Sequence, residues 1–152
     1  MIITTHAVVA AASAQILSQG PFGAFLVGFL SHFALDSLPH WDYPLETLTR
    51  GLSFRSIIKD FLKLSLDFLT GVSLVLFFFQ WQEPLNLILW LAVLGSITPD
   101  IFHNIASFWR TKILKAFSEL HNRFHCPEDL KNPWLGIIIQ FFIVAAFIYF
   151  DL

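Results

Sequence analysis

Three polar residues spaced four apart, His32, Asp36 and His40, close an apolar run of the chain. Four residues make about one helical turn, so His32 and Asp36 are expected on the same face of a helix. Pro39 should end this helix just before it, which leaves His40 on the turn that follows. An imidazole and a carboxylate one turn apart can bind one metal ion. The alternative is a helix end whose polar residues only mark the membrane surface.

The composition is that of an integral membrane protein. The 152 residues are 56% hydrophobic and only 13% charged, whereas a soluble domain is usually about a quarter charged. Mean hydropathy is +0.68, and the 18 Phe and five Trp exceed what a core of this size needs. The length fits one helical membrane domain, residues 1–152. The single cysteine, Cys126, excludes an intrachain disulfide and a multi-cysteine metal site, and the net charge of -2 gives no indication of nucleic-acid binding.

Five apolar segments predict an all-α membrane bundle. They run over about 2–17, 22–38, 53–81, 85–97 and 134–149. The first is rich in Ala, which lets helices approach closely in a bilayer, and a Thr at its start is expected to cap it ahead of His6. Turns are expected at 18–21 and 82–84, and no Lys or Arg precedes the first apolar run, so this run does not resemble a signal peptide. An amphipathic stretch over about 111–124 predicts a helix on the membrane surface, and it ends in the pair His121 and His125.

Two carboxylates stand out inside or beside these apolar segments. Asp67 lies well inside the apolar run 64–79, where a charge is costly and usually functional. We expect it to face the bundle interior, toward the histidines; an ion pair with Lys63 is the alternative. Pro99 is a favourable first residue for a new helix, which would place Asp100 at a helix N-terminus and His103 one turn later.

The distribution of basic residues predicts the orientation. All nine Lys and Arg follow the second or the fourth segment, whereas the turns near 19 and 83 have none. The positive-inside rule then places the N-terminus in the cytoplasm and the C-terminus outside, in a prokaryotic-type inner membrane. With this topology, every histidine falls on the cytoplasmic side together with three aspartates. The predicted metal ligands are His6, His32, Asp36, His40, Asp67, Asp100, His103, His121 and His125.

Imidazole and carboxylate ligands suit zinc, and also manganese or iron. Structural zinc sites are closed and often rich in sulfur, whereas catalytic sites keep an open position, so a His/Asp set with little cysteine indicates the catalytic kind. Water bound to such a metal can ionise near neutral pH and attack a phosphorus or carbonyl centre, and the number of ligands allows a multinuclear site. A site at head-group depth favours a lipid or lipid-linked phosphate as substrate.

Several short motifs resemble the membrane-bound metal-dependent hydrolase family, which is distantly similar to zinc-dependent phospholipase C. They are Thr5-His6 before the Ala-rich segment, Ser31 to Asp36, and Pro99-Asp100, and together they cover about a quarter of the chain. The resemblance implies a helical fold, a His/Asp metal site and hydrolase activity. It implies ligand roles for His6, His32, Asp36 and Asp100, and similar roles for His121 and His125, whose spacing differs slightly from that of the family's His pair. The order also differs, because here His32 and Asp36 precede Pro99-Asp100.

Three functions follow as hypotheses. The first is a hydrolase that acts on a phosphoester or lipid-like substrate at the cytoplasmic face, with Asp100 as the base that orients the attacking water. The second is a metal-ion transporter, since intramembrane acids such as Asp67 mark ion paths. The third is a small, non-catalytic membrane protein whose metal holds helices together. The sequence leaves the metal, the substrate and the oligomeric state open.

Overall fold

The computed structural model describes residues 1–79, 86–109, 111–126 and 132–151, and these residues form helices and no strand. The helices are α1 (Ile3–Leu17), α2 (Gly20–Asp36), α3 (Glu46–Arg50), α4 (Phe54–Phe79), α5 (Leu87–Phe108), α6 (Lys112–Phe124) and α7 (Pro133–Asp151). Three of them are long and apolar enough to cross a membrane, namely α4, α5 and, over Pro133–Phe150, α7. An all-helical protein with membrane-type helices is therefore confirmed. The turn expected at 82–84 lies outside the described residues.

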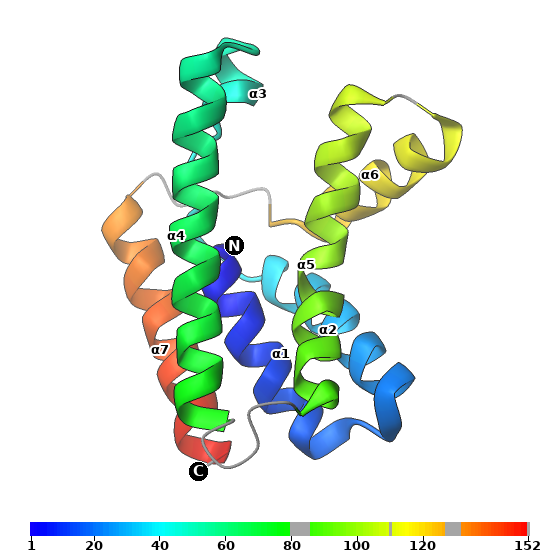
Figure 1. Cartoon of the computed structure of the whole chain (residues 1–152), viewed down its shortest axis with the longest axis vertical. Helices are drawn as coiled ribbons and strands as arrows, with labels where there is room; N and C mark the ends of the chain where they lie inside the picture. Colours follow the sequence, from blue (N-terminus) through cyan, green and yellow to red (C-terminus); the bar gives the residue numbers. More distant parts are fainter. Residues whose placement is uncertain (80–85, 110, 127–131, 152) are drawn as a thin grey trace.

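Helix α1 forms the centre of the bundle, because it packs against α2, α4, α5 and α7. Figure 1 shows α1 with α4 and α7 to one side and α2 and α5 to the other. Its alanines at positions 7, 10, 11, 12 and 14 are buried, as expected for an Ala-rich helix that lets its neighbours approach closely. Helices α2 and α5 approach even more closely, since a Cβ on Gly28 would overlap the carbonyl oxygen of Ala92.

Part of the molecule extends beyond this bundle on one side. Figure 1 shows α3, the first turns of α4, the last turns of α5 and the whole of α6 above the level at which α1 begins. The start of α1 and the end of α2 thus meet at the boundary between the apolar bundle and this extension. Ion pairs in the extension include Lys59 with Glu46, at 2.8 Å. The predicted amphipathic helix is present as α6, and Phe117 on it packs against Phe29 and Phe33 of α2.

The expected helix break before Pro99 is wrong. Helix α5 continues through Pro99 to Phe108, and Thr98 does not cap a new helix but donates from its hydroxyl to the Leu94 carbonyl one turn earlier. Proline is tolerated within such a helix because neighbouring helices compensate for the missing hydrogen bond. Asp100 consequently lies in the interior of α5 and not at a helix N-terminus.

Asp67 faces the bundle interior, as expected, but it does not lie among the metal-ligating histidines, so the expected orientation toward them is wrong. Its carboxylate accepts hydrogen bonds from the backbone N–H groups of Ile3 (2.7 Å) and Thr4 (2.9 Å) and from the Tyr43 hydroxyl (2.9 Å). The first N–H groups of a helix have no intrahelical partner, so Asp67 caps α1 from α4 and replaces the threonine cap that we expected. Lys63 does not pair with it and donates instead to the Pro44 carbonyl.

Candidate metal centre

Four side chains from three helices place one potential metal-ligand atom each close to the other three. His32 and Asp36 come from the last turns of α2, Asp100 comes from α5 and His121 from α6. Their four ligand atoms all lie within 4.8 Å of one another. The two histidines and Asp36 are buried, and Asp100 is partly exposed. We refer to these residues as the four-ligand cluster.

The spacing of the cluster fits a tetrahedral ion. His32 Nε2 lies 3.0 Å from Asp36 Oδ2, 3.1 Å from His121 Nε2 and 3.6 Å from Asp100 Oδ1. His121 Nε2 lies 3.5 Å from Asp36 Oδ2 and 3.4 Å from Asp100 Oδ1. Ligand atoms placed tetrahedrally about 2.0–2.2 Å from a zinc ion are themselves about 3.3–3.6 Å apart. The cluster therefore needs little adjustment to hold zinc.

Unpartnered polar atoms support the same interpretation. Within the described part of the chain, Asp36 Oδ2 accepts no hydrogen bond, and neither ring nitrogen of His6 has a hydrogen-bond partner, although both residues are almost fully buried. A buried polar atom without a partner costs about 1–3 kcal/mol. Such atoms in a native protein call for an explanation, of which a bound ion is one.

The backbone of α5 fixes the orientation of His32. Its Nδ1 lies 2.7 Å from the carbonyl oxygen of Ser96, so this nitrogen carries the proton and donates it. Nε2 is the nitrogen that faces the cluster, and it is the one through which the neutral imidazole would bind a metal. Metal-ligating histidines usually donate their second N–H to a carbonyl or a carboxylate in this way. Pro99, which lacks an N–H group, disrupts the helical hydrogen bonding in this same turn.

Two further histidines stack on histidines of the cluster. The ring of His6 on α1 stacks on His32, with centroids 4.2 Å apart, and its Nε2 lies 3.2 Å from Asp36 Oδ1. The ring of His103 on α5 stacks on His121 at 4.6 Å, and its Nδ1 lies 3.1 Å from the Ser118 hydroxyl. His6 thus reaches the second oxygen of Asp36, whereas His103 supports a ligand and is not itself a member of the cluster.

A second group of possible ligands shares Asp36 with the first. Ligand atoms of Asp36, His40 and His125 lie within 4.8 Å of one another. Asp42 joins them, because its Oδ2 lies 3.2 Å from His40 Nε2 and 3.6 Å from His125 Nε2. The α-amino group of Met1 donates to Asp36 and Asp42. Asp36 therefore lies between two sets of histidines, as a bridging carboxylate would.

The charges of the cluster favour a bound cation. Burial alone would lower the pKa of His121, but Asp100 and Asp36 outweigh it and raise that pKa to about 9. Hydrogen bonding to Asp42 raises the pKa of His125. Burial opposes ionisation of Asp42, yet its contacts with His125 and His40 hold the pKa of this carboxyl below its usual range. The carboxylates therefore favour positive charge on His121 and His125, and a bound cation would supply positive charge at the same place.

Most of the residues singled out in the sequence meet in this region. His6, His32, Asp36, Asp100 and His121 are brought together, His40 and His125 form the second group, and His103 is adjacent; Asp67 is not included. The sequence analysis missed Asp42, for which the spacing from His40 was the available signal. It also missed Gln140 of α7, whose side chain is buried and joins Ile2 N, at 3.1 Å, to the Trp41 carbonyl, at 2.9 Å.

Comparison with protein-family models, curated protein sequences and solved structures finds no match to this chain. The case for a function therefore rests on the residues of the site.

Proposed function

We propose that this chain is a membrane-embedded, zinc-dependent hydrolase that acts on a phosphoester bond of a lipid or lipid-linked substrate; manganese or iron are the alternative metals. The observation that carries the proposal is the four-ligand cluster, in which the two histidine nitrogens lie 3.0–3.6 Å from each other and from the carboxylate oxygens of Asp36 and Asp100. Catalytic zinc sites have three protein ligands and keep the fourth position open for water; here His32, Asp36 and His121 would be the three ligands, with Asp100 beside the open position. The orphaned Asp36 Oδ2 and the fixed orientation of His32 support the same conclusion.

A zinc ion held there would polarise a phosphoryl oxygen and activate a bound water. The chain's own residues then have separate tasks. His32 and His121 would bind the ion through Nε2, and Asp36 would bind it through Oδ2. Asp100 is the most exposed of the four, with 33% of its side chain accessible, so it is the group best placed to accept a proton from an attacking water.

The site would lie at the cytoplasmic surface of an inner membrane. The extension that carries α3 and α6 also carries most of the basic residues, which are enriched on the cytoplasmic side of membrane proteins. The cluster lies where this extension meets the apolar bundle, at the depth of lipid head groups. The phosphate of a lipid is the phosphoester that occurs at this depth.

The test is hydrolysis by the purified protein in phosphatidylcholine nanodiscs that contain phosphatidylglycerol, with bis-para-nitrophenyl phosphate as a soluble phosphodiester. We expect turnover that a chelator abolishes and zinc restores. Asp100→Asn should lose turnover while keeping most of its zinc, whereas His32→Ala should lose both. Zinc-loaded parent protein without phosphodiesterase activity on either compound would contradict the proposal.

A structural metal site is the second candidate. The observation in its favour is that the four ligands come from three helices, so an ion would tie α2, α5 and α6 together. In that case zinc would raise the thermal unfolding midpoint without any turnover. Asp100→Asn would then lower the stability of the zinc-loaded protein and change no reaction rate.

A further inference from the structure

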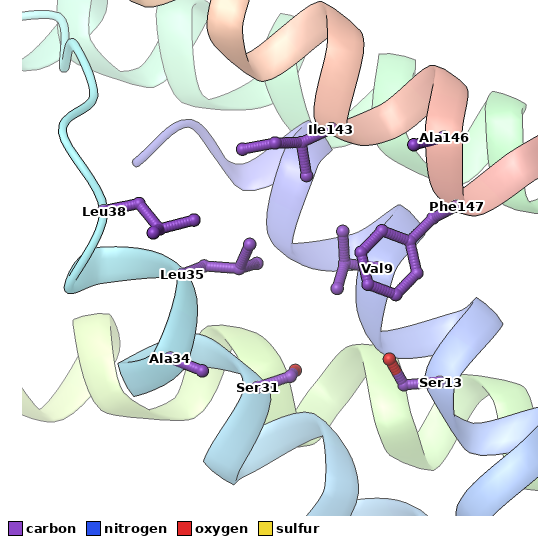
Figure 2. A pocket seen from close by; sticks show the side chains of 9 residues that line it. All are labelled: Val9, Ser13, Ser31, Ala34, Leu35, Leu38, Ile143, Ala146 and Phe147. Atoms are coloured by element: carbon purple, nitrogen blue, oxygen red, sulfur yellow. The ribbon is translucent and has the colours of Figure 1, made fainter.

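We propose that a groove between α1, α2 and α7 holds an acyl chain of the lipid substrate; this inference rests on the hydrolase function proposed above. Figure 2 shows the groove, with side chains of α2 and α7 on its two sides and α1 between them. Its cavity volume is about 380 Å³, within the range of about 300–1,000 Å³ typical of ligand pockets. The lining residues are Val9, Ser13, Ser31, Ala34, Leu35, Leu38, Ile143, Ala146 and Phe147.

The lining suits a hydrocarbon chain and no charged ligand. None of the nine lining residues is charged, and their only side-chain polar groups are the hydroxyls of Ser13 and Ser31. Ser31 already donates to the Gly28 carbonyl within its own helix, at 2.8 Å. Burying a hydrocarbon chain against such a lining leaves no polar group of the ligand or of Ser31 unpaired.

The groove is open toward the region that lipid would occupy. Ala34 of α2 and Ala146 and Phe147 of α7 are exposed. Helix α7 is one of the candidate membrane spans, and its outward-facing side chains are large and apolar, among them Phe141 and Phe142. In a bilayer, the surroundings of this opening are acyl chains, so a lipid can enter sideways.

One end of the groove lies next to the metal centre. Leu35, which lines it, directly precedes the ligand Asp36, and it packs with Val9 and Met1 in one buried cluster. Leu38 lines the same end, and the segment that follows carries His40 and Asp42 of the second ligand group. This segment then reaches α7, where Trp41 packs against Gly136.

The length of the groove fits part of a lipid tail. The lining on α2 extends from Ser31 to Leu35, which is about 6 Å at 1.5 Å per residue, and Leu38 continues it just beyond the end of the helix. A lipid whose tail follows α2 in this direction has its head group at the end occupied by Leu38 and His40. Its phosphate would therefore lie beside the metal ligands, and the groove would select substrates that carry a long chain.

The test of occupancy is photocrosslinking in phosphatidylcholine nanodiscs that contain phosphatidylglycerol with a diazirine in one acyl chain. Crosslinks are expected on residues 31–38 and 143–147. Ala34→Phe and Ala146→Phe fill the groove from its exposed edges and should reduce these crosslinks about tenfold, the scale on which an apolar pocket rejects a chain that no longer fits. Ala116→Phe makes the same change on the exposed face of α6 and should leave them unchanged.

Labelling spread evenly over the outer faces of α4 and α7 would overturn the inference. A comparison of kinetics on a long-chain lipid and on a soluble compound distinguishes binding of the acyl chain from the reaction itself. Ala146→Phe should lower kcat/KM for long-chain phosphatidylglycerol about tenfold and leave bis-para-nitrophenyl phosphate hydrolysis and zinc content unchanged. An equal loss of kcat/KM on both compounds would show that the groove does not bind the acyl chain, and the proposed hydrolase function would be unaffected. No hydrolysis by the parent would refute the hydrolase, and the crosslinks alone would then decide what the groove binds.

Discussion

Replacement of His32 by Gln should reduce zinc affinity strongly, because His32 contacts every other member of the four-ligand cluster. Its Nε2 lies 3.0–3.6 Å from the ligand atoms of Asp36, Asp100 and His121. Zinc sites with four protein ligands bind with about 10–16 kcal/mol, which is roughly 2.5–4 kcal/mol per ligand. Since about 1.4 kcal/mol is tenfold in affinity, His32→Gln should weaken zinc binding by roughly 100- to 1,000-fold.

The matched control is His103→Gln. His103 stacks on His121 with ring centroids 4.6 Å apart, yet it is not a member of the cluster. Both variants are titrated in the same detergent by competition with a chromophoric zinc chelator near neutral pH. His103 stacks on His121 and its Nδ1 lies beside the Ser118 hydroxyl, not beside a ligand, so His103→Gln should change the affinity less than the roughly 10- to 100-fold that the loss of a residue hydrogen-bonded to a ligand costs. An equal effect of the two substitutions, or a loss below about threefold for His32→Gln, would refute the assignment of His32 as a ligand.

Three further predictions concern charge, capping and packing. The pKa of His121 is raised from 6.5 to about 9, so protonated His121 stabilises the chelator-treated protein fully below pH 6.5, and this stabilisation is lost as the pH rises through 9. The thermal unfolding midpoint should therefore fall between pH 6.5 and 9. An equal fall of the midpoint in His121→Gln would contradict this assignment. Asp67→Asn removes a charged hydrogen-bond acceptor from the Ile3 and Thr4 N–H groups. It should lower the free energy of unfolding by about 1–2 kcal/mol and leave the zinc content unchanged. A loss of zinc in this variant would show that Asp67 contributes to the metal site. Gly28→Ala should prevent α2 from packing closely on α5, because a Cβ there overlaps the Ala92 carbonyl, whereas a Cβ on Gly23 would meet no atom closer than 3.9 Å. Gel filtration in detergent should show aggregated Gly28→Ala and a normal profile for Gly23→Ala.

The predictable part of the fold is the part encoded locally. The apolar runs and their turn residues place α1, α2, α6 and α7 within a few residues of their observed ends. His32 and Asp36 share a face because one helical turn separates them, and their 3.0 Å contact follows from this spacing. The short helix α3 was not predicted, because it lies in the polar stretch between the second and third apolar segments.

The remaining features depend on contacts between distant parts of the chain. Nothing in the sequence around Asp67 indicates that α4 would bring this residue to the start of α1. The turn at Pro99 looks like a helix start when taken alone, but α5 continues because helices packed around it stabilise that turn. Gln140 is likewise defined only by its partners Ile2 and Trp41, which are far from it in sequence.

The most direct test of the metal centre is zinc X-ray absorption spectroscopy on purified protein loaded with one equivalent of zinc. The four-ligand cluster predicts a first shell of nitrogen and oxygen atoms about 2.0–2.2 Å from the metal, with the scattering of coordinated imidazole. His32→Gln should lose part of the imidazole signal. A sulfur atom at about 2.3 Å, which only Cys126 or Met1 could supply, or a shell without imidazole would contradict the proposed centre.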